Sequence, residues 1–316
     1  MTQPPSTWSE SPVSSNGVAM RHNAFVYESL DEYVARAVAF LREGLEAGEA
    51  AAVGHTRPGL AAMREALGED AARVTFLNVE DAYTRPAQTL AAYHQVYVEQ
   101  FRKARYVRVA SDVQVGPSPG DWEEWLRYEA LMNRCFAHLP TWALCTYNAD
   151  ALPDPVLDAV WRTHPTVLAE ETWTASEHFE DPAELLRRTT PEPEVLAGLR
   201  AVPFGHDVES FREHLAQELA REDIPGAKAL DMLVAATEIF DNAVQHGGAV
   251  AEVRAGRVQG RFVCEIVDRG DGFDDPTAGY LAPREGVGTG LWVARQLTWR
   301  LEFFRSTHGF TARIWL

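Results

Sequence analysis

The chain has 316 residues, which allow about two domains, and its 46 acidic and 29 basic residues give a formal net charge of −17. This acidity disfavours direct binding to nucleic acid, whose phosphates would be repelled, and is compatible with a basic protein partner. The three cysteines, Cys135, Cys145 and Cys264, form no C-x-x-C pair, which argues against a disulfide framework and against a zinc site.

The beginning of the chain, residues 1–18, is rich in Ser, Pro and Gly and is expected to be disordered. It lacks the charged and apolar regions of a secretion signal. No later run of apolar residues reaches the roughly 18 that are needed to cross a membrane. We therefore expect a cytoplasmic protein that does not bind a membrane.

Strand-like and helical patterns alternate over residues 19–180, which we expect to form the first domain. Runs rich in β-branched and small apolar residues predict strands over residues 23–27, 50–54, 74–78, 106–110 and 142–146. Amphipathic periodicity predicts helices over residues 30–47, 59–67, 86–104, 121–138 and 156–164. Such alternation predicts a parallel or mostly parallel sheet flanked by helices.

Three segments of this half carry a resemblance to a known domain: residues 21–27, residues 41–49, and residues 144–148 with the following residues 160–165. Together they resemble the MEDS sensory domain, which is related to the RecA and KaiC-like α/β fold. The resemblance covers residues 20–178 and implies a sensor that acts beside a regulatory module. No phosphate loop follows either of the first two predicted strands, so we expect no ATP turnover from this domain.

Four polar or aromatic residues of this domain could surround a small-molecule ligand at the strand ends: His22, His55, Tyr147 and His164. Their spacing specifies neither a metal nor a catalytic set, so ordinary packing and capping are the alternative. Tyr93, Tyr97 and Phe101 have helical spacing and are expected to lie in the core.

A change of composition over residues 181–194, where Pro and charged residues replace the periodic pattern, predicts a linker before a second domain of residues 195–316. Residues 202–220 predict a single amphipathic helix. Asp207 stands at the start of this helix and is interpreted as its N-cap. The alternative is that the preceding His206 accepts a phosphoryl group.

The next helix is predicted over residues 228–246, which contain no internal Gly or Pro. Glu238, Asn242 and His246 recur every four residues and share one face of it. The other side carries the residues expected to pack against a sheet: Leu233, Thr237, Phe240 and Val244. A carboxylate one turn from an amide can orient a hydroxyl nucleophile while the amide oxygen ligates Mg²⁺. A solvated helix face is the alternative.

A strand is predicted over residues 261–268, where Asp268 has the parity of the apolar residues and shares their face. A carboxylate at the edge of an apolar pocket suits the exocyclic amine of adenine. Gly270 and Gly272 would keep the backbone low enough for the base to enter. An ordinary strand-to-turn Asp-Gly-Asp-Gly is the alternative.

A third block places Gly286, Gly288 and Gly290 directly before an apolar helix. Backbone amides at a helix N-terminus favour phosphate, and glycines let them converge on it. The block is neither the dinucleotide fingerprint, because its spacing is G-x-G-x-G, nor a Walker A loop, because no Gly-Lys-Ser/Thr follows.

In this order the three blocks resemble the N, G1 and G2 boxes of the GHKL ATPase superfamily. The resemblance covers about residues 194–316 and implies a two-layer α/β sandwich with a mixed sheet, known as the Bergerat fold, which binds ATP and Mg²⁺. It implies that Glu238 is the general base, that Asn242 ligates the metal and that Asp268 accepts from adenine. It implies further nucleotide contacts from the remaining positions of the three blocks: His246, Gly270, Gly272, Gly286, Gly288, Thr289, Gly290 and Leu291.

A single short helix before the second one resembles the anti-sigma factor and serine-protein kinase branch, which includes RsbW and SpoIIAB, and not the two-helix hairpin of histidine kinases. Combined with the MEDS-like half, it resembles the RsbA-family regulators. This implies an ATP-dependent serine/threonine-protein kinase that sequesters a sigma factor and phosphorylates a STAS-type anti-sigma factor antagonist, with a homodimer as one possible assembly.

One departure from the superfamily pattern affects the pocket. GHKL domains often have Gly-Thr on the last strand, where Thr helps to bind adenine, whereas here Gly309 is followed by Phe310 and only then by Thr311. This departure keeps open the alternative of a non-catalytic module that binds a partner when nucleotide is present. A histidine-kinase-like protein, acting in trans or on His206, is a separate alternative to the serine kinase.

Overall fold

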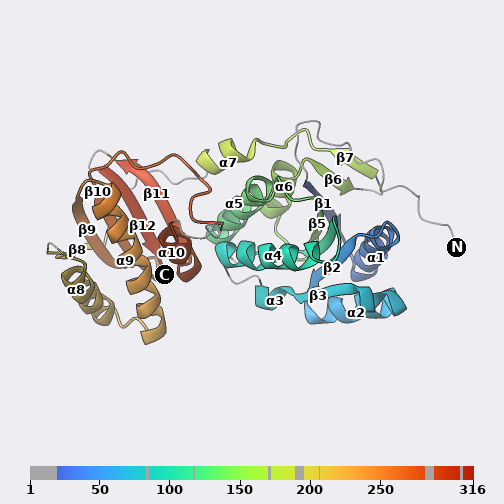
Figure 1. Ribbon diagram of the computed structural model, residues 1–316, viewed down its shortest axis with the longest axis horizontal. Coiled ribbons are helices and arrows are strands. Elements are labelled where there is room, and N and C mark those ends of the chain that lie inside the picture. The colour runs from blue at the N-terminus through green and yellow to red at the C-terminus, as the bar shows by residue number, and fades with distance from the viewer. Residues whose placement is uncertain are drawn as a thin grey trace. The chain divides into compact units, whose positions relative to one another are not determined.

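The structure of the protein is a computed structural model (Figure 1) that describes residues 20–82, 85–116, 118–169, 172–188, 196–205, 207–281, 288–306 and 309–316. The segment expected to be disordered, residues 1–18, lies outside the described residues. The chain divides into two compact units, Met1–Leu185 and Leu186–Leu316. Among the described residues, no helix is both long enough and apolar enough to cross a membrane.

The first unit is built on a seven-stranded sheet with the order β3-β2-β4-β5-β1-β6-β7. Its strands are β1 (Arg21–Tyr27), β2 (Ala50–His55), β3 (Val74–Asn78), β4 (Val107–Asp112), β5 (Thr141–Asn148), β6 (Thr166–Ala169) and β7 (Thr172–Ala175). All neighbours pair in parallel except β6 and β7, so the prediction of a mostly parallel sheet is confirmed. The two short strands β6 and β7 were not predicted.

The helices of the first unit are α1 (Leu30–Glu46), α2 (Arg57–Leu67), α3 (Val79–Ala82), α4 (Pro86–Phe101), α5 (Pro119–Cys135), α6 (Asp154–Thr163) and α7 (Pro182–Arg188), with a 3₁₀ segment, η2 (Gly68–Arg73), after α2. Helices α2, α5 and α6 each begin two residues before the predicted start. In each case a proline lies in the first turn, where its missing N–H costs no hydrogen bond.

Helices cover both faces of this sheet (Figure 1). Phe25 and Tyr27 of β1 join a core with α1 and α2, whereas Ala24 of the same strand joins Cys145 and Val160 on the opposite face. Alternate residues of a strand point to opposite faces, which explains the division. Of the three aromatic residues expected in the core, Tyr93 and Tyr97 are buried, but Phe101, at the end of α4, is only half-buried.

Part of the predicted linker is helical. Asp181 accepts hydrogen bonds from the backbone N–H groups of Ala183 and Glu184, at 2.9 and 3.0 Å, and so caps α7. Leu185 and Leu186 in this helix are buried. The linker prediction therefore overlooked a short capped helix that buries two leucines. Residues 189–195 of the predicted linker lie outside the described residues.

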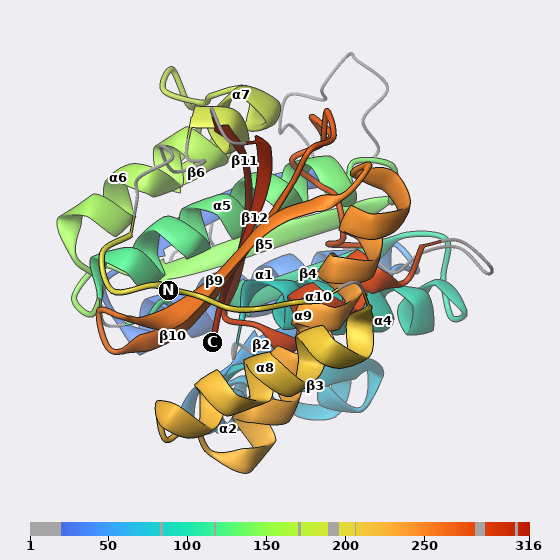
Figure 2. The ribbon, with the colours of Figure 1, turned by 90° about the vertical axis from the view of Figure 1, so that its left-hand side faces the viewer.

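The second unit contains a five-stranded sheet with the order β11-β12-β10-β9-β8. Figure 2 turns this unit toward the viewer. Its strands are β8 (Arg200–Ala201), β9 (Val250–Val258), β10 (Arg261–Asp268), β11 (Arg300–Ser306) and β12 (Gly309–Trp315). Every neighbouring pair is antiparallel, so the expected mixed sheet is wrong in this respect. Strands β10 and β11 run in the same direction, but they are not neighbours. Strand β12 lies between them and pairs antiparallel with both.

Three helices pack on one face of this sheet: α8 (Val208–Arg221), α9 (Gly226–His246) and α10 (Gly290–Leu297). The Asp207 side chain accepts a 2.7 Å hydrogen bond from the Ser210 N–H, which confirms it as the N-cap of α8. His206 lies outside the described residues. Phe211 of α8 stacks on Phe240 of α9 with ring centroids 4.4 Å apart.

The apolar seam of α9 differs from the prediction. Val244 is 53% exposed, and the buried positions are Met232, Ala235, Ala236, Ile239, Phe240 and Ala243. The predicted seam was centred on Phe240. This residue is buried because it packs against α8 and not against the sheet alone. Small alanines instead form much of the contact with the sheet, and they let α9 approach it closely.

Candidate functional site

Two of the three sequence blocks of the second unit meet at the beginning of α10. Glu238 and Asn242 are half-buried on α9, whereas His246 at its end is exposed. A methyl group added at the α-carbon of Gly290 would lie 2.6 Å from Oε2 of Glu238 and 3.5 Å from Nδ2 of Asn242. The backbone of α10 therefore lies close to these two polar groups, and any larger residue at position 290 would require the Glu238 carboxylate to move.

The same two polar side chains are not used to hold the fold together. Within the described part of the chain, neither Glu238 nor Asn242 makes a side-chain hydrogen bond or ion pair. Half-buried polar groups that the fold leaves without partners are suited to bind a ligand or an ion.

Asp268, at the end of β10, lies against the C-terminal end of α9. A methyl group added at Gly247 would be 2.4 Å from its Cγ, and one added at Gly270 would be 2.7 Å from the α-carbon of Gly247. Oδ1 of Asp268 accepts a 2.7 Å hydrogen bond from the Gly270 N–H, which fixes the carboxylate. Partial burial raises the pKa of Asp268, and this hydrogen bond opposes the increase.

Phe310 occupies the place beside Asp268 that the superfamily pattern would give to a Gly-Thr pair. It is the cross-strand neighbour of Asp268, whereas Thr311 is opposite Val267 and points to the other face of the sheet. The ring centroid of Phe310 lies 5.2 Å from that of Phe273 and 6.0 Å from that of Phe303. The wall next to the carboxylate is therefore aromatic.

The aromatic ring of Phe310 leaves no room for a side chain at position 272, which is a glycine. Its φ is +62°, and a methyl group on its α-carbon would lie 2.2 Å from the ring of Phe310. The glycine thus lets the loop after β10 pass over the aromatic ring. Sequence reasoning assigned Gly272 to the approach of a base and did not foresee this packing role.

The third block ends at the N-terminus of α10. Gly286 lies outside the described residues. Gly288 has a φ of +52° and open space at its α-carbon. Thr289 is the N-cap residue, but its side chain makes no capping hydrogen bond, and Leu291 packs against the core of the unit. Among the described residues no side chain caps α10, so its first amides are suited to bind an anion.

The four sequence-predicted positions of the first unit separate into two groups. His22, Tyr147 and His164 lie together on one face of the sheet, and their rings are in contact: the centroid of His164 is 4.2 Å from that of His22 and 5.7 Å from that of Tyr147. His55 points to the other face, where its ring meets that of Tyr33. They cannot all surround one ligand.

His55 belongs to a buried polar cluster at the carboxyl ends of β1, β2 and β4. Asp112 accepts hydrogen bonds from the Tyr27 hydroxyl at 2.8 Å and from the Gln114 amide at 2.6 Å, and Nε2 of His55 is 3.9 Å from its Oδ2. Sequence reasoning missed Asp112 because the predicted strand ended two residues before it. The acid at the end of a strand was the available signal, as it was for Asp268.

Burial shifts the two titrating groups of this cluster in opposite directions. It raises the pKa of Asp112 from 3.8 to about 6, opposed by the hydrogen bond from Tyr27, and lowers the pKa of His55 from 6.5 to about 4. As the pH falls from roughly 7 to 5, Asp112 takes up a proton in the folded state but not in the unfolded state, which increases the free energy of unfolding. Over the same interval His55 takes up a proton only in the unfolded state, which decreases the free energy of unfolding. The two effects largely cancel.

In Asp112→Asn we therefore expect to see the loss of stability on acidification that is caused by His55. The asparagine oxygen can still accept from Tyr27, but the gain on acidification, about 1.4 kcal/mol between roughly pH 7 and pH 5, is lost. Denaturant unfolding of the first unit should show that the variant loses this much more stability than the wild type over the same interval. Asp150→Asn, at an exposed turn, is the matched control and should behave as the wild type does. Equal pH dependence in the wild type and Asp112→Asn would contradict the assignment.

A cavity of about 310 Å³ lies beside the other group of residues, between α5, α6 and the end of β5. Its walls are mainly apolar and include Trp122, Trp125 and Val156, while Glu129 and Tyr147 contribute polar groups. This volume and this lining are typical of a site for a small molecule. Trp122, Trp125 and Glu129 were not singled out in the sequence because apolar and acidic residues at helical spacing describe any amphipathic helix.

Comparison with protein-family models agrees with this division. Residues 21–165 match the MEDS domain, described as the MEthanogen/methylotroph, DcmR Sensory domain, and residues 206–315 match the histidine kinase-like ATPase domain. No curated protein sequence matches the chain. The protein thus joins an N-terminal MEDS sensory domain to a C-terminal ATPase domain of the GHKL type. A domain of the second class implies ATP as its ligand, typically with Mg²⁺.

Proposed function

We propose that the protein is an RsbA-family partner-switching regulator whose ATPase domain binds Mg-ATP and sequesters a sigma factor. In this proposal the ATPase domain also phosphorylates a STAS-type antagonist on Ser or Thr, and the MEDS domain controls it by binding a small molecule in the cavity beside Glu129. Sigma factors act in the cytoplasm, so the proposal places the chain there too.

The observation that carries this proposal is the approach of Gly290 to Glu238 and Asn242. It brings a carboxylate, an amide and the amides of a helix N-terminus to one place, and these are the groups needed at the reacting end of a nucleoside triphosphate. Asp268 lies at the far end of α9, next to Gly247, where it can accept from the base.

Each of these groups has a distinct proposed role. The Asn242 amide oxygen ligates Mg²⁺, and the amides of Gly288, Thr289 and Gly290 hold the phosphates. Glu238 takes the proton of the Ser or Thr hydroxyl as its oxygen bonds to the γ-phosphorus. The bond from that phosphorus to the β–γ bridging oxygen breaks, and ADP leaves. Gly270 holds the Asp268 carboxylate toward the adenine amine. Leu291 packs against the core below the phosphate loop, and His246 and Gly286 supply the remaining nucleotide contacts.

Asp268→Asn tests the pocket. Because the Gly270 N–H bonds to one oxygen of the side chain, the asparagine oxygen takes that position and its NH₂ group faces the amine of the base. A donor then faces a donor, and ATP affinity is expected to fall about 10- to 100-fold. Isothermal titration with Mg-ATP measures this, and Asp271→Asn, in the same loop and fully exposed, is the control. Unchanged affinity in Asp268→Asn would show that the pocket is wrongly assigned.

The aromatic wall supports a second candidate, a module that binds ATP and a protein partner but transfers no phosphate. In this candidate the base is bound more weakly, because Phe310 and not a Thr is the cross-strand neighbour of Asp268. Incubation with labelled Mg-ATP and a STAS-type antagonist separates the candidates. Acid-stable label on the antagonist supports the serine kinase, acid-labile label on this chain supports a histidine-kinase-like activity, and bound ATP without transfer supports the module.

A further inference from the structure

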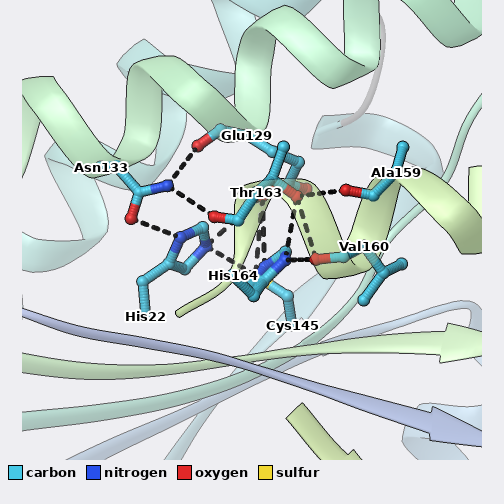
Figure 3. A network of polar contacts seen from close by, with 8 residues as sticks. All are labelled: His22, Glu129, Asn133, Cys145, Ala159, Val160, Thr163 and His164. Atoms are coloured by element: carbon cyan, nitrogen blue, oxygen red, sulfur yellow. Dashed lines mark hydrogen bonds and ion pairs between the residues drawn. The ribbon is translucent and has the colours of Figure 1, made fainter. Parts of the chain in front are cut away.

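Four buried side chains from distant parts of the sequence meet on one face of the first sheet: His22 of β1, Glu129 of α5, Cys145 of β5 and His164 directly after α6 (Figure 3). We call them the buried quartet. Their exposed fractions are 2%, 4%, 7% and 0%. One nitrogen, oxygen or sulfur atom from each lies within 4.8 Å of the others.

The distances within the buried quartet suit a tetrahedral metal ion. Nε2 of His22 is 3.2 Å from Sγ of Cys145 and 3.4 Å from Oε2 of Glu129. The same carboxylate oxygen is 3.7 Å from Nε2 of His164 and 3.9 Å from the sulfur. A tetrahedral zinc ion with bonds of about 2.0–2.3 Å separates its ligand atoms by roughly 3.3–3.8 Å. All four atoms lie within 4.8 Å of one another, so shifts of about 1 Å would bring them to the separations of a tetrahedral site.

The tautomer of His22 is fixed by Asn133. The Asn133 NH₂ group donates to the backbone carbonyls of Glu129 and Thr163, at 3.2 and 2.7 Å, so its Oδ1 atom must be the one that faces His22. This oxygen lies 3.1 Å from Nδ1 of His22 and can only accept. The proton of the neutral ring is therefore on Nδ1, and the lone pair on Nε2 points into the buried quartet.

His164 is fixed in the same way by α6. Its Nδ1 lies 3.1 Å from the backbone carbonyl of Val160, which can only accept. It is also 3.0 Å from the Thr163 hydroxyl, which itself donates to the Ala159 carbonyl. Nδ1 of His164 thus carries its proton, and Nε2 presents a lone pair. An Nδ1–H group held by a carbonyl is the usual support of a metal-binding histidine.

Among the atoms that point into the centre of the buried quartet, hydrogen-bond acceptors outnumber donors. Nε2 of each neutral histidine and Oε2 of the Glu129 carboxylate are acceptors, and the Cys145 thiol is the single hydrogen-bond donor among the four inward-pointing atoms. Nε2 of His164 and Oε1 of Glu129 have no hydrogen-bond partner among the described residues. Such groups are costly to bury without compensation.

We propose that the buried quartet binds a divalent transition-metal ion, with Zn²⁺ preferred. Two imidazoles, a thiolate and a carboxylate form a closed four-ligand set of the kind that zinc takes in structural sites. The carboxylate and the thiolate balance the charge of the ion, and the Cys145 proton is released to solvent on binding. Mg²⁺ and Ca²⁺ are disfavoured because they require oxygen ligands.

Glu129 also links the site to the cavity described above, because its side chain is part of the cavity wall. The cavity gives an ion a route to the buried quartet, and a molecule inside it would touch a metal ligand directly. The proposal depends neither on the ATP site nor on the partner-switching function, since the residues belong to the first unit.

Metal analysis and cobalt substitution of the full chain, purified without a histidine tag, test the proposal. We expect an equimolar amount of zinc to remain through gel filtration, and zinc to raise the melting temperature of the chelator-treated protein. Co²⁺ should give a thiolate-to-cobalt charge-transfer band. Cys145→Ser should abolish that band and weaken zinc binding at least roughly 100-fold, whereas Cys135→Ser, at another buried cysteine, should change neither.

Two results would overturn the proposal. Wild-type protein that retains no zinc and gives no charge-transfer band would show that the buried quartet is only a hydrogen-bonded part of the core. Zinc retained equally by Cys145→Ser would place the ion elsewhere. If Cys145→Ser does not fold, Cys135→Ser and Cys264→Ser keep the test decisive, because a charge-transfer band that persists in both leaves Cys145 as the thiolate ligand, and its loss in either would overturn the proposal.

Discussion

Glu238→Gln is expected to reduce the transfer of phosphate to a Ser or Thr substrate roughly 100- to 10,000-fold, while ATP affinity stays nearly unchanged. Glutamine keeps the size of the side chain but cannot take up the proton of the attacking hydroxyl. The close contact with Gly290 is preserved, because an amide oxygen or nitrogen fills the same space as the carboxylate oxygen. The loss should therefore be in the rate of transfer and not in binding.

The measurement is the rate at which label from Mg-ATP appears as acid-stable phosphate on a purified STAS-type antagonist. Asp241→Asn is a matched control, since it removes a carboxylate from the same helix, α9, at a position that does not belong to the Glu238, Asn242 and His246 face. Transfer that continues at the wild-type rate in Glu238→Gln would exclude Glu238 as the base. An equal loss of ATP affinity would instead show that the carboxylate acts in binding.

Phe211→Ala is expected to destabilise the second unit by about 3–5 kcal/mol. The Phe211 ring is fully buried and stacks face to face on Phe240, with an angle of 9° between the rings. Removing it leaves a cavity between α8 and α9 that the alanine-rich side of α9 cannot fill. Because α9 carries Glu238 and Asn242, the loss should also loosen the nucleotide pocket.

Hydrogen exchange of α9 and β10 amides in the full chain measures this effect on the second unit alone. Val244→Ala provides the comparison, since that side chain lies on the same helix and is 53% exposed. It should change the exchange by less than about 0.5 kcal/mol. Similar exchange in the two variants would mean that the aromatic stack contributes little to the stability of the unit.

The sequence predicted those parts of the molecule that are encoded locally. The polar positions of α9 and the acid that ends β10 lie within single elements, and helical spacing or strand alternation was enough to place them. The strand pairing was not local in this sense. Nothing in β11 indicates that β12 would enter between it and β10, and this insertion is what makes the sheet antiparallel throughout.

The buried quartet was hidden for a related reason. Its members come from β1, α5, β5 and the end of α6, so no short spacing connects them. The sequence argued against a zinc site because it contains no C-x-x-C pair. His22 and His164 were considered together with His55, although alternation along the strands sends His55 to the opposite face. Only the fold could show which histidines have the same carboxylate as a neighbour.

The insertion of β12 has a consequence for how the ATPase unit can be handled. A chain cut before Gly309 would lose a strand with partners on both sides, and β10 and β11 would each present a row of unpaired backbone groups. Two newly exposed strand edges favour self-association. Shortened forms of the unit should therefore aggregate, whereas removal of β8 (Arg200–Ala201), which has one partner and two residues, should be tolerated.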